Sequence, residues 1–408
     1  MMRLLLSPSS EISIHSFGDG GVLFLNGSRR IWVLNSTSAF IWCLLDEVDS
    51  LDELACRVAT TFHINKPKAL HDVNYIMRVF EREGLFDTKA HAESIETDGN
   101  WDITPIGPMI SEPDNWAIKG YFRIANHLFE FCCQDTSMGN SFTSIMKHMA
   151  TNSGGRPDTR IAVASGTGGA KTWDVFLDDL GFSLGLADDE VLPQLATLFF
   201  VRSCEALKDR LLFHAAVIEM GETTVMFPGE AGSGKTTLTA ALLMNGSRYY
   251  SDELAVINVD DLHVSPLPLP MSIKPGSVKP LERYYPGLKH RHIHRRSDGK
   301  MVRYLSPSPH NLPTGERSSQ IDVLIFPKYI EGIENRMVAL NKTEALRRLA
   351  RTGSSNRVFT NRDVGAMIAL IERKPCYEMR FSDLHQAVSQ LKNLAASFEE
   401  SSTVRNSV

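Results

Sequence analysis

The sequence predicts an α/β protein in which a phosphate-binding region follows a small α+β domain. Three observations carry this prediction. A glycine-rich loop at residues 229–236 lies between an apolar strand and an apolar helix. Strands and helices alternate from residue 210 onward, as they do in nucleotide-binding α/β layers. Residues 10–86 contain three strand-like stretches followed by three amphipathic helical stretches.

Length and composition are those of a globular protein with about two or three domains. The chain has 408 residues, of which 43% are apolar and 22% are charged, and its formal net charge is −5. This balance excludes a mostly disordered or collagen-like chain. A weakly acidic chain has no overall electrostatic attraction to nucleic acid, so we expect no nucleic-acid partner.

The sequence favours a cytoplasmic location without membrane contact. The first apolar run, Leu4–Leu6, is too short for a signal peptide. No apolar stretch reaches the ~18 residues that a membrane-spanning helix needs. The six cysteines contain no CxxC pair, which predicts reduced, buried thiols rather than a disulfide framework.

Residues 1–90 are predicted to form the small domain. Its strands are expected at Glu11–Phe17, Val22–Leu25 and Arg30–Leu34, with Asn26-Gly27 as the hairpin signal between the last two. Its helices are expected from Asn35 to about Leu45, from Leu51 to Phe62 and from Pro67 to Gly84.

The rest of the chain divides into four predicted segments. These are a polar linker at 91–115, a β-containing middle segment at 116–204, a catalytic domain at 205–398 and a frayed polar tail at 399–408. In the middle segment, strands are expected at Tyr121–Ile124, Leu128–Phe131, Arg160–Val163 and Thr172–Leu177, and a helix at Val191–Leu207. The last helix is expected from Ser382 to Phe398.

The glycine-rich loop satisfies the pattern GxxxxGK[ST] in full, between a strand at Thr223–Phe227 and a helix at Thr237–Leu243. The nucleotide-binding candidates are Gly229, Glu230, Ala231, Gly232, Ser233, Gly234, Lys235, Thr236 and Thr237. Glycines let backbone N–H groups turn towards an anion, and the helix N-terminus adds partial positive charge. Lys235 can reach the outer phosphates of ATP, and the Thr236 hydroxyl can bind Mg²⁺. ATP and Mg²⁺ are therefore the expected cofactors.

Three further residues with titratable side chains flank this loop. His214 interrupts the apolar stretch Leu211–Ile218, which is predicted to be a strand, and Asp252-Glu253 end one strand and begin another. Adjacent strand residues point to opposite faces, so the two carboxylates should have different roles. One can meet the phosphate and the acceptor hydroxyl, while the other reaches His214. The alternatives are a magnesium-binding Asp252, a solvated Glu253 and a structural His214.

Residues 205–396 resemble the catalytic half of HPr serine kinases. The resemblance rests on Phe213-His214-Ala215, the loop Gly229–Thr236 and Ser251-Asp252-Glu253. It implies that Asp252 is the general base on the substrate hydroxyl and that His214 and Glu253 form a supporting pair. It also implies that Lys235 and Thr236 hold nucleotide and metal. HPr kinases carry Asp-Asp where this chain has Asp252-Glu253.

Two basic segments give weaker candidates for substrate or phosphate contacts. The proline-rich stretch Leu267–Ser277, with Lys274, resembles HPr-kinase-related proteins of ribosomal, lasso-type peptide-modification clusters. Arg303 is a second candidate. The stretch Lys289–Arg296 alternates histidine with basic residues, but no cysteine or carboxylate is interleaved, so a solvated basic loop is favoured over a zinc site.

Residues 10–86 resemble the small, winged-helix-like PqqD-type domain. The resemblance rests on the hairpin that ends at Trp32–Asn35, on the helix Ala39–Leu45 and on the closing pattern up to Phe86. It implies capture of the leader segment of a ribosomal precursor peptide, which adds a strand to an exposed sheet edge. The candidate contacts are Arg30, Ile31, Trp32, Val33, Leu34, Tyr75, Arg78, Val79 and Arg82. A purely structural cap and a DNA-binding winged helix are the alternatives.

Together these patterns predict an ATP-dependent kinase that phosphorylates a Ser or Thr hydroxyl of a precursor peptide held by residues 1–90. Three alternatives stay open: a kinase of an HPr-type carrier protein, a small-molecule hydroxyl kinase, and a non-catalytic, nucleotide-gated peptide-binding module. HPr kinases assemble into hexamers, so the resemblance leaves a homo-oligomer open.

Overall fold

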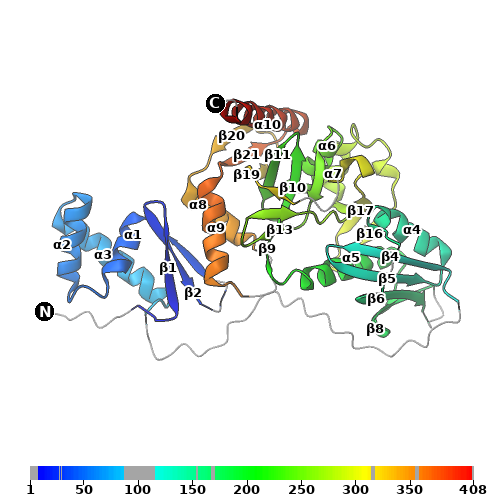
Figure 1. The fold of residues 1–408 in the computed structure, drawn as a ribbon, viewed down its shortest axis with the longest axis horizontal. Helices are drawn as coiled ribbons and strands as arrows, with labels where there is room; N and C mark the ends of the chain where they lie inside the picture. Colours follow the sequence, from blue (N-terminus) through cyan, green and yellow to red (C-terminus); the bar gives the residue numbers. More distant parts are fainter. Residues whose placement is uncertain are drawn as a thin grey trace. The chain divides into compact units, whose positions relative to one another are not determined.

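A computed structural model describes residues 8–26, 28, 30–86, 115–152, 155–166, 171–313, 318–353 and 358–406. The chain is a mixed α/β protein with several sheets (Figure 1). It divides into two compact units, the first of which comprises Met1–Asp98, Leu340–Arg351 and Arg357–Cys376. The predicted linker lies outside the described residues except for Asn115, and so does Gly27 of the predicted hairpin turn.

The N-terminal part of the first unit has the three strands and three helices predicted from the sequence. The strands β1 (Ile12–Phe17), β2 (Gly20–Leu25) and β3 (Ile31–Leu34) form an antiparallel sheet in that order. The helices are α1 (Ser36–Leu44), α2 (Leu51–Phe62) and α3 (Lys66–Arg82). Each begins at a polar N-cap whose side chain accepts a backbone N–H, and the caps are Asn35, Ser50 and Asn65.

Both faces of this sheet are buried. Leu23 and Leu34 pack with the apolar faces of α1, α2 and α3. The alternate residues Val22 and Phe24 are also fully buried, on the face next to α8 (Lys342–Arg351) and α9 (Asn361–Arg373). His15 shares that face, and its Nε2 lies 3.1 Å from the side-chain oxygen of Asn361. The sheet is therefore the middle layer of three.

The second unit contains four sheets (Figure 1). Its strand orders are β12-β10-β11-β19-β21-β20, β18-β14-β13-β9, β15-β17-β16 and β4-β5-β6-β7-β8. The strands of the first two sheets are β9 (Arg210–Phe213), β10 (Ala215–Met220), β11 (Thr223–Pro228), β12 (Arg248–Ser251), β13 (Ala255–Asn258), β14 (His263–Ser265), β18 (Ser319–Gln320), β19 (Val323–Tyr329), β20 (Arg336–Ala339) and β21 (Cys376–Phe381).

The five-stranded sheet confirms the strands predicted in the middle segment. It consists of β4 (Ile118–Ile124), β5 (His127–Cys133), β6 (Thr159–Ser165), β7 (Trp173–Leu177) and β8 (Leu180–Leu186). The helices α4 (Thr136–Met146) and α5 (Val191–Glu205) share an apolar core with it. The rings of Phe129 and Phe199 stack there with their centroids 4.5 Å apart.

The remaining elements complete the second unit. They are α6 (Lys235–Leu243), α7 (Pro275–Leu281), α10 (Leu384–Asn406), β15 (Met271–Ile273), β16 (His294–Arg295) and β17 (Met301–Leu305), with 3₁₀ turns at Lys147–Met149, Leu288–His290 and Pro309–Asn311. The helices α6 and α10 share an apolar core with β10 and β11. Within the described part of the chain, no helix is long and apolar enough to cross a membrane.

Three expectations about elements differ from the structure. The last helix continues to Asn406 instead of ending near Phe398, and the Glu399 carboxylate anchors it by accepting the backbone N–H of Glu222 at 2.8 Å. The predicted strand Leu211–Ile218 is broken at His214, because its two halves belong to different sheets. All six cysteines are free, but Cys43 and Cys56 are exposed rather than buried.

Candidate functional site

Two corners of the chain meet in the second unit. His214 separates β9 from β10, and Asp252-Glu253 lie between β12 and β13. Because β9 pairs with β13 and β10 pairs with β12, both segments pass from one sheet to the other at the same place. The Nδ1 atom of His214 lies 3.1 Å from the carbonyl oxygen of Glu253 and 3.5 Å from its Oε1. The structure thus brings His214 and Glu253 together.

The glycine-rich loop connects the end of β11 to the start of α6. Gly232 and Gly234 adopt φ of 89° and 97°, in the left-handed region that favours glycine. The Lys235 ammonium is buried and donates to the carbonyl oxygens of Gly229 at 2.5 Å and Glu230 at 3.1 Å. Burial lowers its pKa to about 8. The loop therefore closes around this lysine, which also lines a cavity.

Asp252 is buried at the inner side of this site. Its side chain is 4% exposed, and its Oδ1 atom has no hydrogen-bond partner among the described residues. Burial and then the nearby Glu253 charge raise its pKa to about 7, against the opposing influence of the Thr236 hydroxyl and Lys235. A buried carboxylate of this kind is suited to accepting a proton or binding a cation.

The residues present fit Mg²⁺. The unpartnered Asp252 oxygen and the nearby Thr236 hydroxyl are hard oxygen ligands, and Mg²⁺ in phosphate sites usually keeps waters and phosphate oxygens as its other ligands. Over the described ranges of the chain, no group of three or more His, Cys, Asp or Glu side chains is placed to hold a metal ion.

The glycine-rich loop, His214 and Glu253 border a cavity of about 340 Å³, and Asp252 is not part of its lining. Its lining combines the loop and α6 with four basic residues, Lys235, Lys274, Arg296 and Lys300, against one carboxylate, Glu253. Both threonines that begin α6, Thr236 and Thr237, also line it, and the Thr237 hydroxyl lies 2.6 Å from that of Ser277. The excess of positive charge suits a polyphosphate.

The candidate Arg303 does not line this cavity. Its guanidinium instead donates to the carbonyl oxygen of Lys289 at 3.3 Å. Arg296, the last residue of the predicted basic stretch Lys289–Arg296, does line it, and so does Lys300, which was not singled out from the sequence. The sequence feature that could have identified Lys300 is the turn Ser297-Asp298-Gly299 between two short strands. This turn places Arg296 and Lys300 opposite each other, and the Arg296 N–H donates to the Lys300 carbonyl at 2.9 Å.

A second, apolar cavity of about 190 Å³ adjoins the first. The two share Glu253, Ser272 and Arg296 in their linings. Asp252 lines this second cavity and not the first, and most of the second cavity's wall is apolar, from α5 and the segment Leu269-Pro270. Glu253 therefore lines both the basic and the apolar cavity, whereas Asp252 lines the apolar one.

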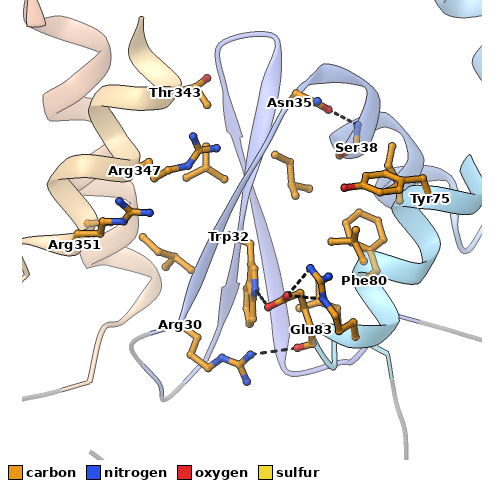
Figure 2. Close-up of a pocket in the computed structure, with 18 residues that line it drawn as sticks. Arg30, Trp32, Asn35, Ser38, Tyr75, Phe80, Glu83, Thr343, Arg347 and Arg351 are labelled. Atoms are coloured by element: carbon orange, nitrogen blue, oxygen red, sulfur yellow. Dashed lines mark hydrogen bonds and ion pairs between the residues drawn. The ribbon is translucent and has the colours of Figure 1, made fainter. Parts of the chain in front are cut away.

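The first unit has its own groove, of about 720 Å³ (Figure 2). Most of the residues predicted as contacts on the edge strand and α3 line this groove. Those that line it are Arg30, Ile31, Trp32, Val33, Leu34, Tyr75, Val79 and Arg82. Arg78 is exposed and does not line it, because it lies on a different side of α3. Helix α8 adds Thr343, Arg347, Ala350 and Arg351, which sequence reasoning missed.

The strand β3 presents a free edge to this groove. It is the last strand of its sheet, and the Leu25 N–H donates to the Arg30 carbonyl. Backbone groups alternate in direction along an antiparallel strand, so those of Trp32 and Leu34 also face β2, while those of Ile31 and Val33 point outward. A peptide can therefore pair with this edge.

Polar contacts hold the end of the groove near Glu83 in place. The Trp32 Nε1 donates to the Glu83 carboxylate at 3.3 Å, and Arg82 pairs with the same carboxylate at 3.3 Å. The Arg30 guanidinium lies over the Trp32 ring, 4.8 Å from its centroid. By contrast, Tyr75 is 66% exposed, so a large aromatic surface faces the groove without a covering partner.

Comparison with known proteins identifies one part of the chain. The family described as "Coenzyme PQQ synthesis protein D (PqqD)" matches residues 20–85. The chain thus carries a PqqD-like domain at its N-terminus, comprising β2, β3 and α1 to α3. The match does not include α8, α9 or the second unit. A search of curated proteins gives no match.

Solved structures add one weak similarity. The structure titled "TbiB1 in Complex with the TbiA(beta) Leader Peptide" is 18% identical and covers 21% of this chain and 99% of its own. Its TM-score of 0.19 is too low to carry a structural argument.

Proposed function

We propose that this chain is an ATP-dependent kinase that phosphorylates a Ser or Thr hydroxyl of a ribosomally synthesised precursor peptide. The observation that carries the proposal is that the glycine-rich loop and the buried Lys235 line one basic cavity, with the buried Asp252 beside Thr236 and Lys235. A strand, a glycine loop and a helix N-terminus are what phosphate binding requires. The resemblance to HPr serine kinases adds the reaction type.

In this proposal each side chain has a separate role. The loop N–H groups and Lys235 bind the phosphates of ATP. Thr236 and Asp252 would hold Mg²⁺, which would neutralise charge on the transferred group. Asp252 takes the proton of the acceptor hydroxyl as its oxygen bonds to the γ-phosphorus. The bond from that phosphorus to the bridging oxygen breaks, and ADP leaves.

His214 and Glu253 support this arrangement without contacting the transferred group. Their contact spans the two chain corners and restrains the segment that carries Asp252. The adjoining apolar cavity is the proposed place for side chains that flank the acceptor hydroxyl, because Asp252 lines it. A peptide rather than a polar metabolite is the acceptor that such a wall favours.

The PqqD-like domain supplies the peptide specificity in this proposal. The family resemblance implies leader capture, and the outward-facing backbone of Ile31 and Val33 supplies the edge on which a leader strand pairs. The aromatic surface of Tyr75 gives it apolar contact. Holding the leader raises the effective concentration of the acceptor at the second unit.

Intact-mass spectrometry tests the proposal. Short precursor peptides encoded beside this gene are incubated with the protein and Mg-ATP, and the Lys235→Ala variant is the control. A gain of one phosphoryl group that the variant abolishes supports the peptide kinase, and fragmentation locates the acceptor. Phosphorylation of a free metabolite instead favours the small-molecule kinase. Peptide binding without any transfer favours the nucleotide-gated binding module.

A further inference from the structure

The groove of the first unit has a second wall that the PqqD-like domain does not provide. Trp32 and Leu34 point towards the face of the sheet covered by α1 to α3, whereas Ile31 and Val33 share the opposite face with Phe24 and Val22. Helix α8 lies on that opposite face, as Figure 2 shows with Arg347 and Arg351 on one side of the sheet and Phe80 on the other.

A strand added to β3 would continue this two-sided arrangement. Successive side chains of a strand point to opposite faces. Every second residue of the added peptide would therefore face α3, and the residues between them would face α8. The α3 wall is apolar over Tyr75, Ile76, Val79 and Phe80. The two walls thus select different side chains at alternate positions.

The α8 wall is basic. Thr343, Arg347 and Arg351 are spaced four apart, so they form one stripe along the helix, while Leu346 and Leu349 are buried on another side. Glu344 is the one acidic residue of α8, and both Arg347 and Arg348 pair with it, at 3.0 Å and 2.7 Å. The helix therefore keeps an excess of positive charge.

The lining of the groove as a whole is also positively charged. It contains four arginines, Arg30, Arg82, Arg347 and Arg351, and one carboxylate, giving a formal charge of +3. That carboxylate, Glu83, is already engaged by Trp32 and Arg82. An acidic peptide segment is the complementary occupant.

We infer that the groove selects a leader segment in which acidic side chains alternate with apolar ones, with the acidic side chains facing α8. The inference rests on the proposed leader binding and adds its sequence pattern. This pattern requires both β3 and α8. The two elements belong to the same unit although they lie about 300 residues apart in the sequence.

Fluorescence anisotropy with synthetic peptides tests the inference. Three short fluorescein-labelled peptides alternate leucine with glutamate, with glutamine or with lysine, and binding is measured at physiological ionic strength. Arg347 and Arg351 can each form a partly exposed ion pair with a glutamate of the peptide. Two such pairs should make the wild type bind the glutamate peptide about tenfold more tightly than the glutamine peptide. In the R347E/R351E variant the preference should reverse to the lysine peptide. Arg373→Glu, an exposed change near the end of α9, is the matched control and should keep the wild-type preference.

The reversed preference is a gain of binding that an unfolded variant cannot produce. Equal binding of the glutamate and glutamine peptides by the wild type, or an unchanged preference in R347E/R351E, would overturn the inference. Val33→Pro removes one outward-facing N–H of β3 and should weaken binding of the glutamate peptide. If it does so while R347E/R351E has no effect, leader pairing stands and the basic wall is wrong. If Val33→Pro has no effect, the proposed leader site itself is wrong.

Discussion

Asp252 is the residue on which the proposed chemistry depends most directly. Asp252→Asn keeps the shape of the side chain but cannot accept a proton at neutral pH. We expect phosphoryl transfer to fall about 10²–10⁴-fold while nucleotide binding persists, because general-base catalysis usually contributes that much. Mass spectrometry of the peptide and titration with a fluorescent ATP analogue measure the two quantities separately. Near-normal transfer in this variant would remove Asp252 from the role of general base.

His294 gives a residue-scale prediction that is independent of catalysis. Its ring is buried, its Nδ1 has no hydrogen-bond partner among the described residues, and burial followed by the His292 charge lowers its pKa to about 4. The unfolded chain binds a proton near pH 6.5, so protonation favours unfolding below that pH. The folded state therefore has the full benefit of a neutral His294 above about pH 6.5, and it loses this stabilisation as the pH falls towards 4.

Thermal unfolding at pH 7.5 and at pH 5 tests this effect. In His294→Phe the aromatic contact with Tyr304 remains but the titrating group is gone. The loss of Tm between the two pH values should be smaller than in the wild type. His290→Phe, on the exposed part of the same segment, should leave the loss unchanged. An equal loss of Tm in His294→Phe and the wild type would contradict the assignment.

At the scale of elements, the turn from β11 into α6 depends on Gly234. A Cβ atom at this position would lie 2.7 Å from the Phe381 ring, and φ of 97° is strained for any other residue. Gly234→Ala should therefore destabilise the fold by about 1–3 kcal/mol and weaken nucleotide binding. Gly276 lines the same cavity, but a Cβ atom at this position would meet no other atom. The stability of the Gly276→Ala variant should therefore be unchanged or higher. Denaturant titration and ATP-analogue binding compare the two, and equal effects would contradict the argument.

The elements also show which parts of the structure a sequence can reveal. The strand–loop–helix unit around Lys235 was predictable because its glycines and helix start carry a local pattern. The break at His214 was not, because β9 pairs with β13 and β10 with β12, and such pairings depend on residues about 40 positions away. The stripe Thr343, Arg347 and Arg351 was missed for a similar reason: an amphipathic helix does not indicate which surface it covers.

At the scale of the whole molecule, the first unit is built from segments far apart in the sequence. Helices α8 and α9 follow β20 and precede β21, two strands of the six-stranded sheet, yet they belong to the unit that contains the PqqD-like domain. The segment predicted as one catalytic domain, 205–398, is thus distributed over both units. This arrangement changes how leader binding should be tested.

Removal of residues 1–90 should do more than remove the leader site. It would uncover the sides of α8 and α9 that now contact β3 and β1, including any apolar side chains buried there. Each such side chain stabilises the fold by about 1.5–3 kcal/mol when buried. We expect the truncated protein to aggregate or to bind hydrophobic dyes, as measured by size-exclusion chromatography and dye fluorescence. A monomeric truncated protein with the wild-type Tm would contradict this view of the first unit.

Point variants in β3 therefore separate leader binding from catalysis better than truncation does. Proline is tolerated on an edge strand where the lost N–H faces outward, as at Val33. If the leader acts by raising the local concentration of the acceptor, Val33→Pro should raise KM for the full precursor at least about tenfold. Its kcat/KM for the core peptide without leader should equal that of the wild type, because the cavity lined by Lys235 and the neighbouring Asp252 are untouched. Steady-state kinetics on the two peptides measure this difference. Equal losses on both peptides would show that the variant disturbs the catalytic unit, and no loss on either would show that β3 does not bind the leader.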